Sequence, residues 1–197
     1  MARASTERDR AKADRHSALL SEAARLFAER GFAGVSLEDL GSAVGISGPA
    51  VYRHFAGKQA VLGAILLSVS EELHAGGRAV MDAGGTADAR IDRLVGFHVD
   101  FALNQPDVIR VQDREMSHLL ASDSHAVRRL QREYVETWVG VLAEAQPERD
   151  ERELRVRAHA CFGLINSTPH SVRALRDAPD AGDVRSILHA MARAALA

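Results

Sequence analysis

The chain has 197 residues, of which 46% are hydrophobic and 26% charged, so it can bury a core in one large or two small domains. Its net charge of −2 does not by itself indicate a nucleic-acid partner, but the first 60 residues carry nine Lys and Arg against seven Asp and Glu, and the remainder sixteen against twenty. The single cysteine, Cys161, excludes an intrachain disulfide and a CxxC metal motif. With no apolar run near the roughly 18 residues of a membrane span, we expect a cytoplasmic protein without a membrane partner.

The N-terminal part is predicted to contain an arm and a first helix. Residues 1–15 are polar and lack periodicity, which indicates a flexible arm. Apolar residues then recur at helical spacing from Leu19 to Phe27. Gly31 is the type of residue that ends a helix, so we expect the first helix to stop there.

Two short helices should follow, over 37–44 and 48–54. Ser36, with Asp39 three residues later, forms an approximate capping box at the start of the first. Gly45 ends that helix and supplies the small residue that a tight turn needs. Two short helices joined in this way predict a helix-turn-helix, the motif that many DNA-binding proteins place in the major groove.

The rest of the chain is predicted to be helical as well, because few residues are β-branched and no stretch alternates like a strand. Gly76 and Gly77 are expected to break or fray the first of these later helices, and Pro169 to kink the fifth. The chain is therefore predicted to be all-α. The six further helices are bounded by glycine, proline or capping residues and are expected over 58–83, 86–103, 106–120, 123–146, 150–175 and 180–195.

The string over residues 19–62, LLSEAARLFAERGFAGVSLEDLGSAVGISGPAVYRHFAGKQAVL, resembles the TetR family of bacterial transcriptional regulators. The resemblance implies a flexible arm over 1–15, a three-helix DNA-binding domain over 16–60 and a helical ligand-binding and dimerisation domain over 61–197. The residues that carry it are Ala24, Phe27, Gly31, Phe32, Ser36, Leu40, Gly45, Ile46, Ser47, Val51, Tyr52, His54, Phe55 and Lys58.

The predicted DNA-binding residues lie in and around the second of the short helices. Tyr52 and His54 fall on the face away from Val51 and Phe55, where their O–H and N–H groups can donate to phosphate oxygens. Lys58 adds a positive charge at the next helix start, and the resemblance implies the same phosphate contacts. The full predicted set is Ser36, Glu38, Ser47, Gly48, Pro49, Ala50, Tyr52, Arg53, His54 and Lys58.

Sequence readout by this set should be unusual because the residues expected at the base edges, Gly48, Pro49 and Ala50, are small and apolar. They allow close backbone approach and contact with a thymine methyl, but they make no bidentate hydrogen bond to a base. Glu38 either accepts from a cytosine amino group or complements its own helix dipole, and both interpretations stay open. Specificity would then depend in part on DNA shape.

The resemblance implies a homodimer that pairs through the last two helices and binds a palindromic double-stranded operator. Their apolar stripes, which include Cys161 and Ile165 on one helix and Ile187 and Met191 on the other, fit either that interface or an intrachain core.

The middle helices would hold a small, largely apolar effector, with an acyl compound as one candidate. The predicted lining consists of large apolar residues and a few polar groups: Phe97, His98, Phe101, Met116, Tyr134, Trp138, Phe162 and Asn166.

The sequence thus favours a repressor released from DNA by its effector, with no cofactor and no metal. The alternatives are a constitutive regulator and a metal-responsive one, although the nine histidines have poor ligand spacing. An enzyme is disfavoured because the chain has no GxxxxGK[ST] or GxSxG motif and because Cys161 and His159, two residues apart, point to different helix faces.

Overall fold

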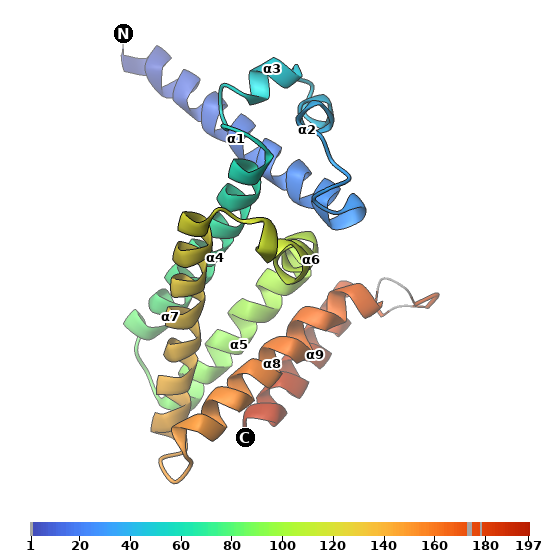
Figure 1. Ribbon diagram of the computed structural model, residues 1–197. Helices are drawn as coiled ribbons and strands as arrows, with labels where there is room; N and C mark the ends of the chain where they lie inside the picture. The colour runs from blue at the N-terminus through green and yellow to red at the C-terminus, as the bar shows by residue number, and fades with distance from the viewer. Residues whose placement is uncertain (1, 173–174, 178) are drawn as a thin grey trace. The chain divides into compact units, whose positions relative to one another are not determined.

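The computed structural model describes the backbone of residues 2–172, 175–177 and 179–197, and the side chains of those residues from His16 onward. Within this described part every regular element is helical and no strand occurs, which confirms the all-α prediction (Figure 1). The elements are α1 Ala2–Arg30, α2 Leu37–Ala43, α3 Gly48–Val51, α4 Lys58–Asp82, α5 Ala87–Asn104, α6 Pro106–Glu115, the 3-10 helix η1 Met116–His118, α7 Ala121–Ala145, α8 Glu151–Val172 and α9 Ala181–Leu196.

These helices form two compact units. The first runs up to Val69 and adds Arg110–Val127; the second consists of Ser70–Ile109 and Arg128–Ala197. Helix α4 therefore contributes its first half to one unit and its second half to the other. The sequence placed the domain boundary at residue 60 and assigned 110–127 to the larger domain, so the division in the structure differs from that prediction.

Helix α1 begins at Ala2, where the sequence predicted a flexible arm over 1–15. The helix contains no glycine or proline and is rich in alanine and arginine, which are strong helix formers. It can therefore continue towards the N-terminus from the C-terminal half that packs in the core. It ends as predicted at Gly31, whose φ of 73° is left-handed. The Gly31 N–H donates to the Phe27 carbonyl at 2.9 Å, which satisfies one of the last carbonyls of the helix.

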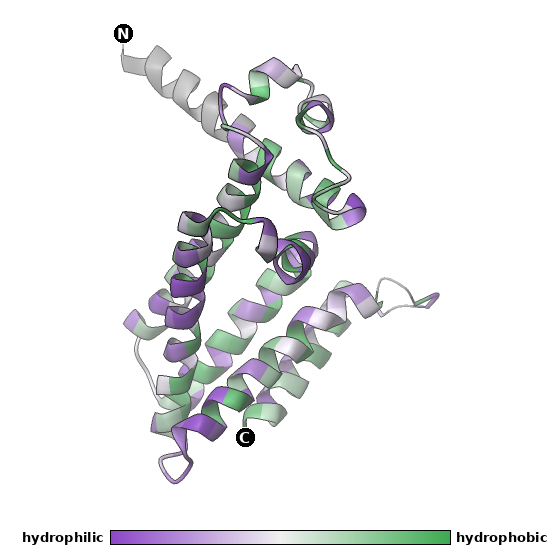
Figure 2. Cartoon of the chain, in the orientation of Figure 1, coloured by the Kyte–Doolittle hydropathy of each residue, from purple (hydrophilic) through white to green (hydrophobic). Residues whose placement is uncertain are grey.

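The first unit has a core built from the inward faces of its helices. Figure 2 shows these faces in green on α1 and α4. Fully burying one such leucine or phenylalanine contributes about 1.5–3 kcal/mol, so this small core fixes the positions of α2 and α3. Its most buried members, all at most 3% exposed, include Leu19, Ala23, Leu26, Phe27, Leu40, Val51, Val61 and Leu62.

In the second unit, α5, α8 and α9 pack side by side (Figure 1). Helix α4 runs through Gly76 and Gly77 without interruption, so the predicted break there is wrong. A Cβ atom on Gly76 would lie 2.0 Å from the Phe97 ring, and one on Gly77 would lie 2.9 Å from the Tyr134 ring. Close packing by these two rings explains the glycines and offsets their helix-propensity cost of about 1 kcal/mol each.

Helix α6 is shorter than the helix predicted over 106–120. Helix α6 stops at Glu115 and passes into η1, whereas the sequence predicted one helix to residue 120. Helix α8 contains the buried Pro169 and continues to Val172. Residues 173–174 of the predicted helix over 150–175 lie outside the described residues, and the predicted kink at Pro169 stays a prediction.

Candidate nucleic-acid interface and effector core

The start of α2 is fixed by the capping box that the sequence predicted. The Asp39 N–H donates to Ser36 Oγ at 3.1 Å, and the Ser36 N–H donates to the Asp39 carboxylate at 2.8 Å. The Ser36 hydroxyl also donates to this carboxylate at 2.7 Å, and these bonds hold the pKa of Asp39 below its ordinary value. The hydroxyl predicted to bind DNA is therefore engaged as a cap, a contact worth about 1 kcal/mol to the helix.

The turn between α2 and α3 depends on two glycines. Gly45 has a φ of 71°, a left-handed conformation that favours glycine. A Cβ on Gly41 would lie 2.7 Å from the Ile46 carbonyl oxygen, so only glycine lets α2 approach this turn. The Ile46 N–H donates to the Gly41 carbonyl at 2.9 Å and closes the turn.

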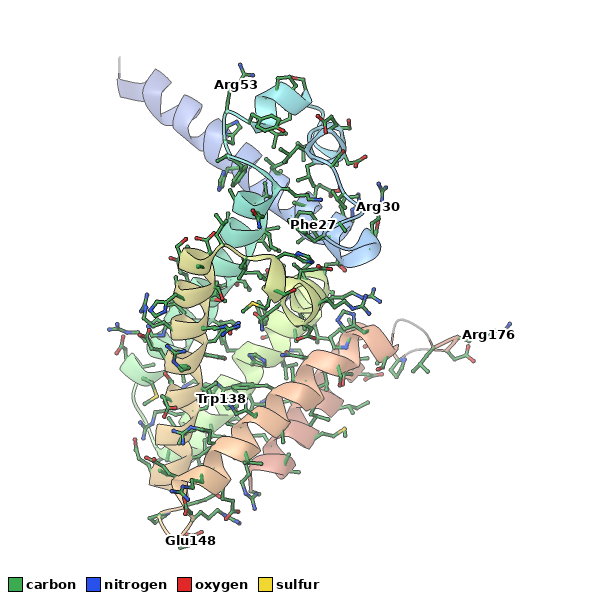
Figure 3. All side chains as sticks on the ribbon, in the orientation of Figure 1. Phe27, Arg30, Arg53, Trp138, Glu148 and Arg176 are labelled. Atoms are coloured by element: carbon green, nitrogen blue, oxygen red, sulfur yellow. The ribbon has the colours of Figure 1, made fainter. Side chains whose placement is uncertain are left out.

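Helix α3 is one turn long, and the turn that follows it presents three side chains to solvent. It ends at Val51, whereas the sequence predicted 48–54, although the Phe55 N–H still donates to the Val51 carbonyl at 3.0 Å. Val51 and Phe55 are buried, whereas Tyr52 is 57% exposed. Arg53 and His54 are exposed as well, and Figure 3 shows Arg53 extending away from the ribbon.

The other residues predicted to contact the bases differ in how exposed they are. Ser47, Pro49 and Glu38 are exposed, and Gly48 is half-buried. Ala50 is only 9% exposed, so its methyl group lies within the core of this unit and not at its surface. The base-reading role of Ala50 stays a prediction, and its burial leaves little of the residue exposed for a contact with a base.

Lys58 is bound within its own unit. Its ammonium donates to the Phe32 carbonyl at 2.6 Å and to the Val35 carbonyl at 2.7 Å. It also lies 4.4 Å from the centre of the Phe32 ring, a cation–π distance. Two of its three N–H donors are thus used to hold the α1–α2 loop, which leaves one for the phosphate contact that the sequence predicted.

Phe32 also joins this loop to η1, a link that the sequence analysis missed. Its ring stacks on the His118 imidazole with centroids 4.7 Å apart. His118 Nε2 lies 3.6 Å from the carboxylate of Glu115, which is only 8% exposed. Gln59 completes the link by donating to the His118 carbonyl at 3.1 Å. No local signal reveals these contacts, because 86 positions of sequence separate the two stacked rings.

In the second unit, His98 lies at the centre of an aromatic cluster. Its ring centroid is 4.8 Å from that of Phe162, 5.8 Å from those of Phe101 and Tyr134, and 6.0 Å from that of Trp138. Trp138 and Phe162 meet edge-on at 4.9 Å. Trp138, labelled in Figure 3, is 1% exposed, so the cluster is closed around it.

The polar atoms of this cluster are hydrogen bonded in one consistent pattern. His98 Nε2 lies 3.1 Å from Asn166 Oδ1, and His98 Nδ1 lies 3.3 Å from the Tyr134 hydroxyl. Because Asn166 Oδ1 only accepts, we assign the proton of the neutral ring to Nε2, so that the Tyr134 hydroxyl donates to Nδ1. Burial lowers the pKa of His98 from 6.5 to about 4, so the ring is neutral at pH 7.

The other buried groups of the cluster are uncharged too. Burial raises the pKa of the Tyr134 hydroxyl above its ordinary value, an effect partly opposed by the nearby Trp138 indole. Burial also raises the pKa of the Cys161 thiol, to about 12. The buried Trp138 indole N–H makes its contact with the Tyr134 hydroxyl outside normal hydrogen-bond geometry, yet the contact still lowers the pKa of that hydroxyl.

The structure brings together six of the eight residues predicted to line an effector site: His98, Phe101, Tyr134, Trp138, Phe162 and Asn166. Phe97 is on the same helix but packs against Gly76 of α4. Met116 belongs to the first unit, so it is not a member of this cluster. Phe97 and Met116 therefore lie apart from the other six, because residues one position or one helix apart in sequence need not share a packing layer. The effector-binding role of all eight residues stays a prediction.

Two sequence models of one family match this chain. The first, described as "Bacterial regulatory proteins, tetR family", matches residues 19–65, and the second, "Tetracyclin repressor-like, C-terminal domain", matches residues 84–170. The HTH-type transcriptional repressor KstR2 of Rhodococcus jostii (strain RHA1) is 30% identical over 132 residues. The chain belongs to the TetR family. The matched residues are 66% of this chain and 65% of that relative, so the chain spans just under two thirds of its length.

Solved TetR-family structures share the fold over most of the chain. A TetR-family regulator from Bordetella parapertussis 12822 covers 92% of this chain and 93% of its own, with a TM-score of 0.80 at 21% identity. A TetR/AcrR-family regulator from Thermobifida fusca YX-ER1 covers 91% and 97%, with a TM-score of 0.65 at 25% identity. The ketosteroid transcriptional regulator KstR2 of Mycobacterium tuberculosis covers 92% and 93%, with a TM-score of 0.72 at 23% identity. These matched families and relatives are regulators, not enzymes.

Helices α8 and α9 of this TetR-family chain have both a buried and an exposed apolar side. Cys161 and Ile165 are buried within the chain, as are Val184 and Leu188. The exposed side carries large apolar side chains that are at least half exposed: Val156, Ile187 and Met191. The sequence left open whether these stripes form core or interface; their buried members are core, and the exposed ones are not explained by packing within the chain.

In the described part of the chain, no group of three or more His, Cys, Asp or Glu side chains is placed to hold a metal ion. None of the described helices is long and apolar enough to cross a membrane.

Proposed function

We propose that this chain is a sequence-specific DNA-binding transcriptional regulator that acts as a repressor and leaves its operator when a small, largely apolar effector binds. The observation that carries the proposal is the exposed surface of Tyr52, Arg53 and His54, which directly follows α3 in a TetR-family chain; α3 itself is joined to the capped helix α2 by a glycine-dependent turn. Such a surface has no packing role within its unit, and its donors suit phosphate oxygens.

On DNA, the contacts would divide by chemistry. Tyr52 and His54 would donate to phosphates and Arg53 would add a cation, so these three residues would fix the position of the protein along the DNA. Ser47, Gly48 and Pro49 would approach the bases closely in the major groove, and Glu38, whose side chain lies beside Gly48, stands near the same edge. The capping by Ser36 and the carbonyl contacts of Lys58 would act mainly by holding this surface in shape.

Two copies of the chain would bind a palindromic operator as a homodimer. The exposed Val156, Ile187 and Met191 support this, because exposed apolar side chains grouped on two neighbouring helices are typical of a protein interface. A dimer also reaches two half-sites about one helical turn apart, which a single helix-turn-helix does not.

The effector would bind at the aromatic cluster around His98, with an acyl compound as a candidate class. The mixture of five aromatic or imidazole rings and a few fixed polar groups suits a small apolar ligand. A structurally similar regulator, AibR, has been solved in complex with isovaleryl coenzyme A and operator DNA; its TM-score is 0.71 at 17% identity.

A footprinting experiment tests the function. The DNA upstream of the chain's own gene is incubated with the purified protein, and protection of a palindromic segment is expected. Arg53→Ala should weaken protection, whereas Arg176→Ala, which removes an exposed arginine of the second unit, should leave it unchanged. Protection that is absent, or insensitive to Arg53→Ala, would refute the proposed interface. Protection that no small molecule relieves would point to a constitutive regulator.

A further inference from the structure

We propose that Glu38 selects a C·G base pair in each half of the operator by accepting a hydrogen bond from the amino group of the cytosine. This inference rests on the proposed function in taking α2 and α3 as the elements that bind DNA. It follows from the position of the Glu38 carboxylate beside the first residue of α3, and from the chemistry that the start of α3 lacks.

The first residues of α3 offer little with which to distinguish one base from another. In a helix-turn-helix, the residues that start the second helix contact the base edges. Here they are Gly48, Pro49 and Ala50, which have no polar side-chain atom, and Ala50 is only 9% exposed. The Ser47 hydroxyl makes no cap hydrogen bond, but a hydroxyl both donates and accepts and so tolerates either kind of base edge. A discriminating group must therefore come from a neighbouring element.

Glu38 supplies such a group from the first turn of α2, which packs against α3 (Figure 1). A Cβ atom on Gly48 would lie 3.3 Å from Glu38 Cγ and 3.4 Å from Glu38 Oε1. The acidic side chain thus reaches across to α3 and lies directly against its first residue, in space that the glycine leaves open. This places the carboxylate at the end of α3 that contacts the bases.

The Glu38 carboxylate is also available for a partner outside the chain. The residue is exposed, and no hydrogen bond or ion pair joins its side chain to another described residue. The adjacent Asp39 differs, because its carboxylate accepts from the Ser36 N–H and hydroxyl and so fixes the cap of α2. Of the two consecutive acids at the start of α2, one is used by the fold and the other is not.

A carboxylate distinguishes the bases because it only accepts hydrogen bonds. In the major groove cytosine presents an amino donor, whereas guanine presents two acceptors and thymine presents an acceptor beside its methyl group. Adenine has an amino donor too, but its neighbouring N7 is an acceptor that repels a carboxylate. Cytosine is therefore the base that fits. Any other base at this position should weaken binding about 5- to 100-fold, the usual cost of one wrong base pair.

Selection of binding sites from random double-stranded DNA by the full-length protein tests the assignment. Wild type should recover a C·G pair in each half-site that Glu38→Ala no longer requires. In Glu38→Gln the preference at that pair should move towards A·T, because a glutamine amide matches the N6 and N7 edge of adenine. Glu71→Gln, which removes an equal charge from an exposed position of the second unit, should keep the wild-type preference.

The preference of one protein among sequences is a ratio, so it does not depend on how much of a variant is folded. The same preferred sequence in wild type and in both Glu38 variants would overturn the proposal. A uniform gain in affinity for every sequence in the two variants would overturn it as well, because the carboxylate would then face a phosphate and not a base.

A modified base tests the contact itself in gel-shift titrations. N4-methylcytosine still pairs with guanine but carries a methyl group in place of the N–H that faces the major groove. At the position that depends on Glu38, this base should weaken wild-type binding about 5- to 50-fold and the binding of Glu38→Ala less than about 2-fold. Equal losses for the two proteins would assign the amino group to another residue and contradict the role of Glu38.

These outcomes are separable from a failure of the proposed function. A protein that recovers no preferred sequence at all disproves the sequence-specific regulator. A protein that recovers a palindromic sequence, with a preference that Glu38→Ala and Glu38→Gln leave unchanged, disproves this inference and leaves the regulator intact.

Discussion

His98 makes the stability of the fold depend on pH. Its pKa is about 4 in the folded chain and near 6.5 when unfolded, so unfolding takes up a proton between these values. The stabilisation is fully present above pH 6.5 and is lost as the pH falls towards 4, by about 3 kcal/mol in total. Urea unfolding at several pH values should show this loss. In His98→Gln the loss over the same window should be smaller, since no buried imidazole remains; an unchanged slope would contradict the assignment.

Arg53 and Lys58 should differ in their effect on DNA binding, although both are basic residues of the same unit. Arg53→Ala removes one exposed phosphate contact per protomer, so the salt slope of operator binding should fall by about two for a dimer. Lys58→Met should leave the slope nearly unchanged but destabilise the unit by about 1–3 kcal/mol, because the ammonium holds the Phe32 and Val35 carbonyls.

The measurements are salt titrations of operator affinity and denaturant unfolding of each variant. A drop of two in the slope for Lys58→Met would show that its ammonium reaches a phosphate after all, as the sequence alone suggested. Unfolding of Arg53→Ala at the wild-type midpoint serves as the control for its exposed position.

At the scale of helices, two glycines of ordinary helical conformation should respond oppositely to alanine. In Gly76→Ala the new Cβ would overlap the Phe97 ring, so we expect a loss of about 1–3 kcal/mol. In Gly140→Ala the new Cβ meets nothing within 4 Å on the exposed side of α7, so the helix should gain about 1 kcal/mol. Guanidinium unfolding of both variants measures this, and destabilisation by Gly140→Ala would contradict the free space at that position.

The glycines also show what can be predicted from sequence. Gly31 and Gly45 were identified as helix ends because their role depends on their own φ, which is local. Gly76 was misinterpreted as a helix break because its role depends on Phe97, a contact made only after α4 and α5 pack. Likewise, the residues of the aromatic cluster could be predicted individually from the sequence. The hydrogen bond between His98 and Asn166 could not, because it joins residues 68 positions apart and has no local signal.

For the whole molecule, the exposed side of α8 and α9 should decide the oligomeric state. Ile187→Glu places a charge on a half-exposed apolar position, so we expect a monomer at micromolar concentration and a large loss of operator affinity, since one protomer reaches one half-site. Sedimentation velocity measures the first effect and gel shift the second. Ala83→Glu, an equal charge at an exposed position outside α8 and α9, should stay dimeric. A dimeric Ile187→Glu would place the interface elsewhere.

The aromatic cluster gives the protein a built-in optical probe. Trp138 is the one tryptophan among the 197 residues. When the unlabelled protein is excited at wavelengths that tyrosine does not absorb, its fluorescence therefore comes from a single buried indole. Tyr52 and Arg53 belong to the other unit, so Trp138 reports on the unit that holds the cluster. A spectral change on adding operator DNA would therefore mean that the cluster itself responds to DNA, and linkage requires the same free energy to act in reverse when a ligand fills the cluster.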